Sequence, residues 1–200
     1  MRLMKIACAA ALTFAACLGV ASTASASEVW IGGYAHALGT KQRECGFDTQ
    51  LGIRSDRIES LWWLGKPSIH LLGSVNSEVR TDFVAVGVNY PLHIFPDKRF
   101  FIRPGIGIAY TNGEADVGNA FEPGLSASEK ARRIQLNATR IDFGSHAVFE
   151  PEFALGYHFT PKLSAEISYV HLSNGQILHQ GKNQGLDDVG ARLTYRFNAR

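Results

Sequence analysis

The sequence has little cysteine and no large excess of charge of either sign. Only three cysteines occur among 200 residues, and the formal net charge is +2. So small a charge argues against a protein that binds nucleic acid through bulk electrostatics. A disordered chain is also excluded, because 46% of the residues are hydrophobic. The length favours a single domain.

Beyond its N-terminus the sequence also lacks long hydrophobic runs. After residue 26 no stretch approaches the roughly 18 apolar residues of a membrane-spanning helix. The mean hydropathy is −0.04, which excludes a bundle of such helices. A membrane β-barrel is compatible with this value, because its strands alternate apolar and polar residues and the two contributions cancel.

The first residues have the features of a secretory signal peptide. A basic start at Arg2 and Lys5 precedes an apolar run, and Ala24–Ala26 forms an A-x-A cleavage signal. We therefore expect residues 1–26 to be removed. Residues 27–200 would then form one exported β-barrel domain.

Cysteine chemistry has no evident role in the mature chain. Cys8 and Cys17 lie in the signal segment, and lipidation at Cys17 is a weaker alternative to cleavage after Ala26. Cys45 is then the only cysteine left, so no internal disulfide can form. We interpret Cys45 as an inert buried thiol, and one cysteine cannot make a thiolate metal site.

Alternation of apolar and polar residues with a period of two recurs through the mature chain. In the segment 187–197, for example, Val189 and Leu193 share one parity, whereas Arg192 and Arg196 share the other. This pattern predicts β-strands with one apolar face. The segments that show it are 28–38, 48–56, 67–77, 82–92, 99–110, 145–159, 162–173 and 187–197.

The two faces of these strands favour a transmembrane barrel over a soluble sandwich. The polar parity mixes charged residues with glycine, which suits a narrow lumen filled by side chains. Aromatic residues gather at one end of the apolar parity, as in the girdle at a membrane interface. They are Tyr90, Phe100, Tyr157, Phe159, Tyr195 and Phe197. We predict an all-β fold, an eight-stranded antiparallel transmembrane β-barrel in the outer membrane of a Gram-negative bacterium.

The predicted connections fit one orientation of this barrel. Short turns at 95–97 and 160–161 would face the periplasm, and the longest connection, about 111–144, would lie outside the cell. A capping-box sequence at Ser126–Glu129 predicts a short helix there. Its basic residues either meet lipopolysaccharide phosphates or are ordinary solvated charges. These residues are Lys130, Arg132, Arg133 and Arg140. The segment Leu61–Leu64 is either an interfacial anchor or part of a strand.

Polar residues interrupt the lipid-facing stripe at the outer end of the last hairpin. His171 and Ser173 share the apolar parity of their strand, and Asp187 is the first lipid-facing residue of the next strand. The hairpin should place all three on one exterior patch. A base, a nucleophile and a carboxylate are the components of a hydrolytic triad. The alternative is that they are ordinary polar residues at the membrane interface.

Two motifs in this hairpin resemble a known family. The segments His171–Asn174 and Asn183–Asp187 are similar to the C-terminal signature of the outer-membrane lipid A 3-O-deacylases of the PagL type. The pattern of that family is H-x-S-N followed by N-x-G-x-E shortly before the last strand. Weaker similarity reaches back to the strand near 82–92. Asp187 stands where the family pattern has glutamate, and the loop between the motifs is longer here.

The resemblance implies that the chain is a lipid A 3-O-deacylase, a carboxylic ester hydrolase. It assigns Ser173 as the nucleophile, His171 as the general base and Asp187 as the acidic member of a triad on the lipid-facing surface. The candidates for stabilising the oxyanion are Asn174, Asn183 and the backbone N–H groups near Gly175. The alternative for Asn174 is a turn residue in the Asn174–Gly175 pair.

The expected partners are lipid A or lipopolysaccharide as the substrate and the outer-membrane lipids, with no nucleic acid. No cofactor and no metal are expected for the reaction, because the sequence has no H-E-x-x-H motif. The sequence does not fix the oligomeric state, so a homodimer is left open. The rival interpretations are a non-enzymatic adhesin-like barrel or narrow pore, an acyltransferase or phospholipase, and a soluble lipocalin-like barrel.

Overall fold

The computed structural model describes residues 26–39 and 44–197, so the predicted signal peptide lies outside it except for Ala26. The strands are β1 (Ala26–Ala35), β2 (Phe47–Ser55), β3 (Ser68–Asn76), β4 (Phe83–Asn89), β5 (Leu92–His93), β6 (Phe100–Thr111), β7 (Ala147–His158), β8 (Leu163–Leu172) and β9 (Leu186–Arg196). The connections contain a 3₁₀ helix, η1 (Glu59–Leu64), and an α-helix, α2 (Ala127–Thr139).

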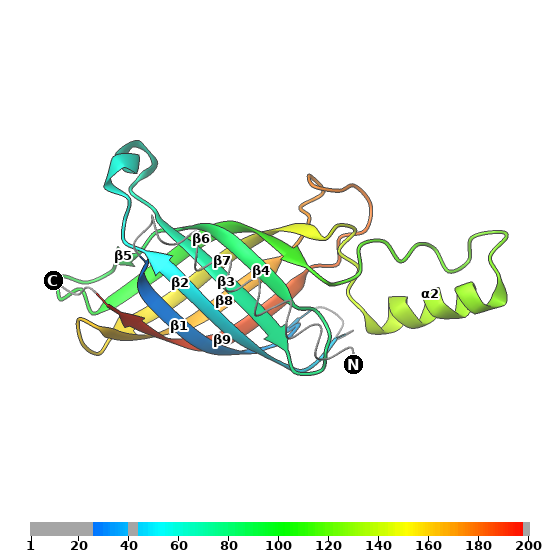
Figure 1. Ribbon diagram of the computed structural model, residues 1–200, viewed down its shortest axis with the longest axis horizontal. Helices are drawn as coiled ribbons and strands as arrows, with labels where there is room; N and C mark the ends of the chain where they lie inside the picture. The colour runs from blue at the N-terminus through cyan, green and yellow to red at the C-terminus, as the bar shows by residue number, and fades with distance from the viewer. Residues whose placement is uncertain (1–25, 40–43, 198–200) are drawn as a thin grey trace.

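All strands except β5 form a closed antiparallel barrel (Figure 1). Consecutive strands pair with each other, β4 pairs with β6, and β1 pairs with β9 to close the wall. The two-residue strand β5 only extends the start of β6. Closure leaves no sheet edge with unpaired backbone groups, which a wall in lipid could not tolerate. The predicted eight-stranded barrel is confirmed.

The predicted strand bounds agree with the structure to within three residues. The largest differences have local causes. β1 stops at Ala35, because the chain turns at Ala37, whose φ is +54°. β4 stops at Asn89, because Pro91 has no N–H to continue the ladder. Leu61–Leu64 belongs to η1 and not to a strand.

The two ends of the barrel differ, and we call them the loop end and the turn end. The loop end carries the connections 36–46, 77–82, 112–146 and 173–185, and the turn end carries the other connections. The helix α2 projects beyond the loop end along the long axis (Figure 1). No helix among the described residues is both long enough and apolar enough to cross a bilayer.

The helix α2 begins where the capping box predicted. The Ser126 hydroxyl accepts a hydrogen bond from the backbone N–H of Glu129 at 3.2 Å. Hydrogen bonds from Arg132 and Arg133 hold the pKa of the Glu129 carboxyl at about 2. Two of the four basic residues in this connection are therefore paired within the helix itself.

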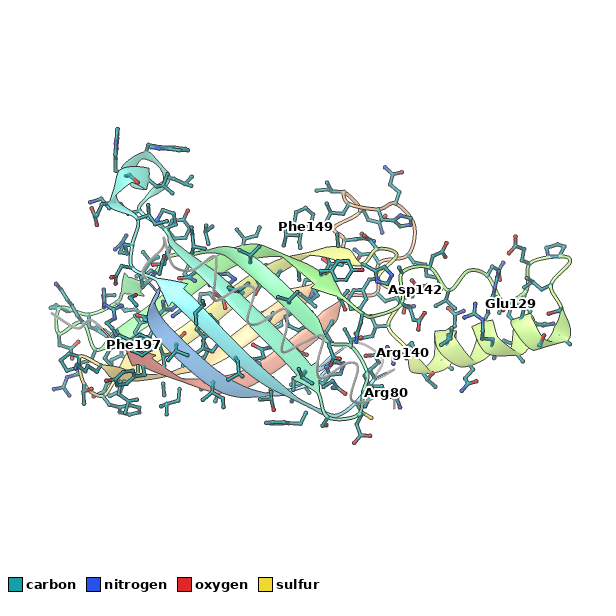
Figure 2. All side chains as sticks on the ribbon, viewed as in Figure 1. Arg80, Glu129, Arg140, Asp142, Phe149 and Phe197 are labelled. Atoms are coloured by element: carbon teal, nitrogen blue, oxygen red, sulfur yellow. The ribbon has the colours of Figure 1, made fainter. Side chains whose placement is uncertain are left out.

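Aromatic side chains surround the turn end, as the sequence predicted. The ring centroids of Phe100 and Tyr157 are 4.8 Å apart, and those of Tyr195 and Phe197 are 5.5 Å apart. Figure 2 shows Phe197 at the end of the barrel opposite Arg140. This arrangement gives the turn end the aromatic rim expected at a membrane interface.

The lumen near mid-height is filled by paired charges. Arg192 donates hydrogen bonds to Glu152 at 2.9 Å and to Glu166 at 2.7 Å. Arg54 donates to Glu28 at 2.6 Å. These side chains are all buried, so the polar parity faces inward and the apolar parity faces outward.

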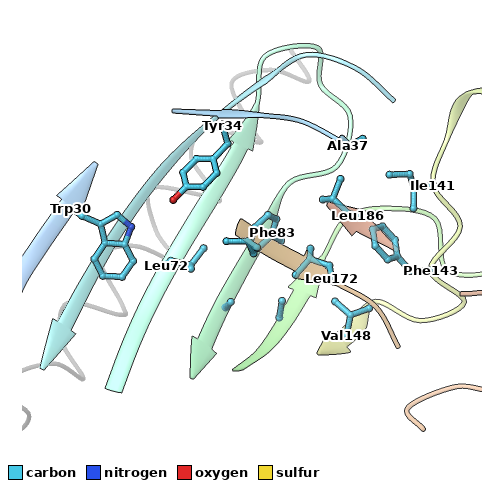
Figure 3. Packing of buried hydrophobic residues seen from close by; sticks show 13 residues of the cluster. Trp30, Tyr34, Ala37, Leu72, Phe83, Ile141, Phe143, Val148, Leu172 and Leu186 are labelled. Atoms are coloured by element: carbon cyan, nitrogen blue, oxygen red, sulfur yellow. The ribbon is translucent and has the colours of Figure 1, made fainter. Parts of the chain in front are cut away.

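Toward the loop end, apolar side chains of the last hairpin and of the long connection pack together inside the barrel (Figure 3). Leu172 of β8 and Leu186 of β9 face each other across the strand pair, and both are fully buried. Phe143 and Val148 join the same cluster. Burial of each leucine stabilises the fold by about 2 kcal/mol. This cluster therefore holds the last hairpin in register at its outer end.

Candidate active site

His171 of β8 and Asp187 of β9 occupy directly opposite positions of the antiparallel pair. Nδ1 of His171 lies 2.6 Å from Oδ1 of Asp187. Because the register places the two residues face to face, the short aspartate side chain reaches the imidazole. The departure from the glutamate of the family pattern is therefore compatible with direct contact.

This pair lies on the outer face of the barrel wall. The side chains of His171 and Asp187 are 30% and 17% exposed, whereas the neighbouring Leu172 and Leu186 are fully buried. Ile167, on the same parity of β8, is 65% exposed. The imidazole and the carboxylate therefore continue the lipid-facing stripe.

Ser173 follows the last residue of β8 and keeps the direction of the strand. Its backbone N–H donates to the carbonyl of Phe149 at 3.2 Å, and the N–H of Phe149 donates to the Ser173 carbonyl at 2.7 Å. Figure 2 shows Phe149 at the loop end of the barrel. Because of this bridge, Ser173 and His171 share a parity and are about 7 Å apart along the strand.

The Ser173 hydroxyl makes no hydrogen bond to any other residue that the structure describes, and the side chain is partly exposed. The structure therefore joins His171 to Asp187 directly. It places Ser173 on the same face without a hydrogen bond to the imidazole.

Tyr169 is a further member of this outer face, and the sequence analysis did not single it out. Its hydroxyl donates to Oδ1 of Asp187 at 2.5 Å. Its ring stacks on the ring of His171, with centroids 6.5 Å apart and an interplanar angle of 22°. One carboxylate oxygen therefore accepts hydrogen bonds from both Tyr169 and His171. The common parity of the three residues was the available signal, but an exposed tyrosine is also typical of a membrane interface.

Gly185 lies against the edge of the imidazole that Asp187 leaves free. A Cβ built at this position would be 3.0 Å from Cε1 and 3.6 Å from Nε2 of His171. The φ of Gly185 is +38°, which also favours glycine. The glycine of the second motif thus lets the backbone approach the base closely.

Asn174 is a buried structural residue of the loop 173–185. Its Nδ2 donates to the carbonyls of Phe143 at 2.6 Å and of Lys182 at 2.8 Å. Its Oδ1 accepts from the N–H of Gln176 at 2.7 Å. Both amide hydrogens are therefore already used in holding the loop, and neither points freely toward a substrate.

Asn183 and Gly175 have donors that remain available. Oδ1 of Asn183 accepts from the backbone N–H of Asn174 at 3.0 Å, which orients the side chain. Within the described residues, neither Nδ2 of Asn183 nor the N–H of Gly175 donates to a protein acceptor. Gly175 has a φ of +63° and lies against the ring of Phe149.

The second motif is held by the segment 141–144 of the long connection. Gln184 donates its backbone N–H to the carbonyl of Asp142 at 3.1 Å and accepts the N–H of Asp142 on its side-chain oxygen at 3.0 Å. This reciprocal pair docks the residues just before Gly185. The long connection therefore supports the imidazole edge as well as the loop that contains Asn174.

None of the three triad residues belongs to a cluster with metal-ligand geometry in the described part of the chain. The only such cluster there consists of His36, Asp48 and Asp188, inside the barrel. The arrangement on the outer face can supply a base, an orienting carboxylate and a hydroxyl to a molecule embedded in the membrane. These are the groups of a serine hydrolase.

Comparison with known proteins gives a family and a fold. The family model for lipid A 3-O-deacylase (PagL) matches residues 43–196. The crystal structure of the outer membrane enzyme PagL is similar, with a TM-score of 0.60 and 15% identity over 86% of this chain and 100% of that chain. A de novo designed transmembrane β-barrel gives a TM-score of 0.48 and 10% identity, over 86% of this chain and 98% of that chain.

Neisserial surface protein A gives a TM-score of 0.47 and 10% identity, over 85% of this chain and 96% of that chain. No curated protein sequence matches significantly. The family match covers more than half of the chain, and the PagL structure has the same barrel fold. The chain therefore belongs to the PagL family of lipid A 3-O-deacylases, as an outer-membrane β-barrel that is an ester hydrolase.

Proposed function

We propose that this chain hydrolyses the ester-linked hydroxyacyl chain at the 3-position of lipid A, with Ser173 as the nucleophile, His171 as the general base and Asp187 as the orienting carboxylate. The observation that carries this assignment is the 2.6 Å contact between Nδ1 of His171 and Oδ1 of Asp187 on the outer face. The reaction is inferred from membership of the family. The catalytic groups are inferred from the side chains of the last hairpin.

Asp187 sets the tautomer of the base. Its carboxylate accepts a hydrogen bond, so the proton of the neutral imidazole resides on Nδ1 and Nε2 keeps its lone pair. Nε2 lies on the side of the ring toward Gly185. Proton transfer requires Ser173 Oγ within about 3 Å of Nε2, and such contacts often tighten only when substrate binds.

The reaction proceeds in two steps. Ser173 Oγ attacks the ester carbonyl carbon while Nε2 takes its proton, and the tetrahedral intermediate then expels the sugar oxygen, which takes that proton back. Water next attacks the acyl-serine, again with His171 as the base, and releases the fatty acid. The free donors on Asn183 and Gly175 are the candidates to stabilise the oxyanion, and one such donor contributes about 3 kcal/mol.

The position of the site fits a substrate that stays in the membrane. The polar groups lie at the loop end of the outer face, directly above exposed apolar residues such as Ile167 and Val189. An ester of lipid A lies where the acyl chains leave the sugar, so the carbonyl reaches Ser173 while the chains remain in hydrocarbon. All residues of the site come from one chain, so the reaction needs no second copy.

Mass spectrometry of lipid A from cells that express the chain tests this assignment. The native chain should remove one hydroxyacyl group, and Ser173→Ala should leave lipid A unchanged. Ser145→Ala is the matched control, because Ser145 also lies at the loop end but only caps the backbone N–H of Ala147. This control should retain full activity.

Two results would contradict the assignment. One is deacylation by Ser173→Ala at the native rate, in a barrel shown to be folded by its heat-modifiable migration on a gel. The other is unchanged lipid A in cells that contain folded native chain. Hydrolysis of purified phospholipid, with lipid A untouched, would instead indicate a different lipid substrate.

A further inference from the structure

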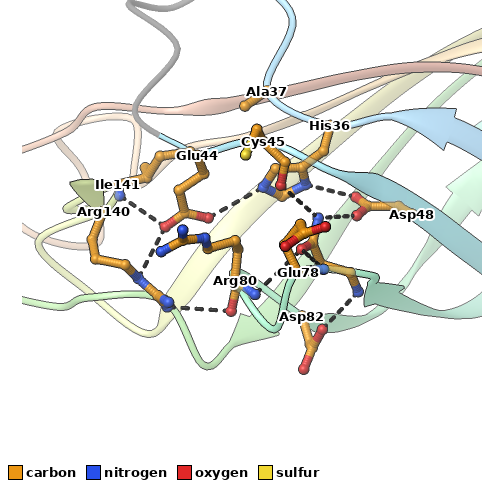
Figure 4. Close-up of polar contacts among 12 residues, drawn as sticks. His36, Ala37, Glu44, Cys45, Asp48, Glu78, Arg80, Asp82, Arg140 and Ile141 are labelled. Atoms are coloured by element: carbon orange, nitrogen blue, oxygen red, sulfur yellow. Dashed lines mark hydrogen bonds and ion pairs between the residues drawn. The ribbon is translucent and has the colours of Figure 1, made fainter.

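Behind the active-site hairpin, the interior of the loop end holds one imidazole among three carboxylates. Figure 4 shows two of them, those of Glu44 and Asp48, beside His36. Nδ1 of His36 lies 2.8 Å from Oδ2 of Asp48 and 3.7 Å from Oδ1 of Asp188. Nε2 of His36 lies 3.2 Å from Oε2 of Glu44. None of these four side chains is more than 1% exposed. So dense a group of buried ionisable side chains needs compensating charge.

One oxygen in this cluster has no partner. Oδ2 of Asp188 is buried and receives no hydrogen bond from a nitrogen or hydroxyl donor of the described residues, and the polar group beside it is the carboxyl group of Asp48. No lysine or arginine in the described chain forms an ion pair with Asp48 or Asp188. A buried carboxylate oxygen without a donor is costly and calls for an explanation.

The geometry around His36 is that of a metal ligand with its supporting groups. Ligand atoms of His36, Asp48 and Asp188 all lie within 4.8 Å of one another. His36 uses its other ring nitrogen to bond Glu44, and metal-bound histidines commonly donate that N–H to a carboxylate. Glu44 is fixed in turn by Arg140 at 3.1 Å.

The two aspartates are also oriented from behind. Nδ2 of Asn76 donates to Oδ1 of Asp48 at 2.7 Å, and the N–H of Ala37 donates to Oδ1 of Asp188 at 3.3 Å. Asp48 thus keeps Oδ2 for His36, whereas Oδ1 of Asp188 both accepts from Ala37 and faces His36. Such hydrogen bonds to the ligands are what fix a metal site.

The second buried histidine of the barrel provides a contrast. His70 lies 3.1 Å from Glu150 and 3.8 Å from Glu152, but Arg192 pairs with Glu152 at 2.9 Å. Nδ2 of Asn89 forms a hydrogen bond with Nδ1 of His70 at 3.1 Å. Oε1 of Glu150 and Oε1 of Glu152 also lack partners among the described residues, so the two clusters differ in the cation and not in the unpartnered oxygen. Because Arg192 already brings a positive charge to that group, His70 and Glu150 serve as the control.

We propose that His36, Asp48 and Asp188 bind one Zn²⁺ ion through Nδ1 and one oxygen of each aspartate. An imidazole with two carboxylates suits zinc, whereas calcium and magnesium prefer oxygen ligands alone. Three protein ligands leave the fourth position of a tetrahedral site to water. The ion joins β2 and β9 to the residue that follows β1, and it takes no part in the ester hydrolysis.

Zinc binding to the native barrel is the direct test. Untagged chain, purified in detergent and freed of metal with EDTA, is titrated with ZnCl₂, and the bound metal is counted by mass spectrometry. We expect one zinc per chain, with an affinity that rises with pH because zinc displaces the Nδ1 proton. Calcium and magnesium should not compete.

X-ray absorption of the zinc-loaded native chain identifies the ligands without any substitution. The expected shell contains only nitrogen and oxygen at about 2.0–2.2 Å, including one imidazole. A sulfur ligand would overturn the proposal, because it would place the metal on Cys45, which is exposed and not buried as the sequence predicted. Absence of stoichiometric zinc from folded native chain would overturn it as well.

Substitutions locate the ion. Asp188→Asn should weaken zinc binding at least tenfold, and Glu150→Gln should leave the affinity unchanged. Equal affinity in native and Asp188→Asn chains would place the metal elsewhere and overturn the proposal. Zinc binding is measured without substrate. A negative result in these tests would therefore leave the proposed triad unaffected.

Discussion

Asp187 and Asp188 are consecutive residues of β9 whose carboxylates lie on opposite faces of the barrel wall. Outside, Asp187 bonds Nδ1 of His171 at 2.6 Å. Inside, Asp188 lies 3.7 Å from Nδ1 of His36. The strand pleat alone produces this division, because successive side chains point to opposite faces. Whatever fixes Asp188 in the interior therefore also fixes the backbone that presents Asp187.

Removing the charge of Asp187 should abolish most of the activity. Asp187→Asn keeps the size of the side chain but no longer holds the proton on Nδ1 of His171, and such a change lowers kcat by about four orders of magnitude. The activity is measured as the release of fatty acid from lipid A in detergent. Asp187→Glu is the control, and it should keep more activity than asparagine because it restores the carboxylate. If the Asp187→Asn variant were as active as the native chain, Asp187 would be excluded from the triad.

Loss of the Tyr169 hydroxyl should lower kcat and leave KM unchanged. In Tyr169→Phe, Asp187 keeps His171 as its only donor, so the carboxylate is held less firmly against the imidazole. We expect kcat for fatty-acid release from lipid A to fall several-fold, because the orientation of His171 becomes looser.

A purely structural role for Tyr169 predicts a different result. The kcat per folded barrel would then stay at the native value while the amount of folded barrel decreases. Tyr195→Phe is the control, because Tyr195 lies on the same outward parity at the turn end, far from the hairpin loop.

Asn183→Asp separates the two roles of the side chain. The aspartate can still accept the N–H of Asn174 through Oδ1, but it has no Nδ2 donor for the oxyanion and brings a negative charge. We expect kcat to fall by about 10²–10³-fold with little change in thermal stability. A variant that keeps the native kcat would remove Asn183 from the list of oxyanion donors.

Gly185→Ala should displace the base. The new Cβ would lie 3.0 Å from Cε1 of His171, closer than ordinary contacts allow. Because the imidazole is held by Asp187 on its other side, it must tilt, and a shift of about 1 Å costs about 10²-fold in rate. The crystal structure of the variant should show the rotated ring. Gly73→Ala is the control, since a Cβ at that position would meet no atom within 4 Å and the φ of Gly73 is not positive.

Alternation of residue types predicted the barrel and the outer position of the hairpin residues, because both depend on the pleat alone. The parity of His171 and Asp187 follows from the residues on either side, so their exposure on one face could be expected. Their direct pairing depends on register, which the apolar pair of Leu172 and Leu186 fixes in the structure.

Contacts between loops that are far apart in the chain could not be predicted from the sequence. Asn174 was a candidate oxyanion donor, but its amide binds the carbonyl of Phe143, which lies 31 residues earlier in the chain. The cluster around His36 joins three segments in the same way, and no short motif connects them. The alternation along one strand predicts which side chains share a face of the barrel wall. The path of a long connection determines which of those side chains already form hydrogen bonds within the protein.

The compactness of the hairpin has a practical consequence. The proposed base, nucleophile and acid all fall within residues 171–187, a single uninterrupted stretch of chain. Such a stretch is a candidate for transplantation into an unrelated eight-stranded scaffold. The graft would have to carry residues 141–144 as well, because their carbonyls anchor Asn174 and Gln184. Activity in such a graft would show that the loop and the segment 141–144 are sufficient for catalysis at a lipid surface.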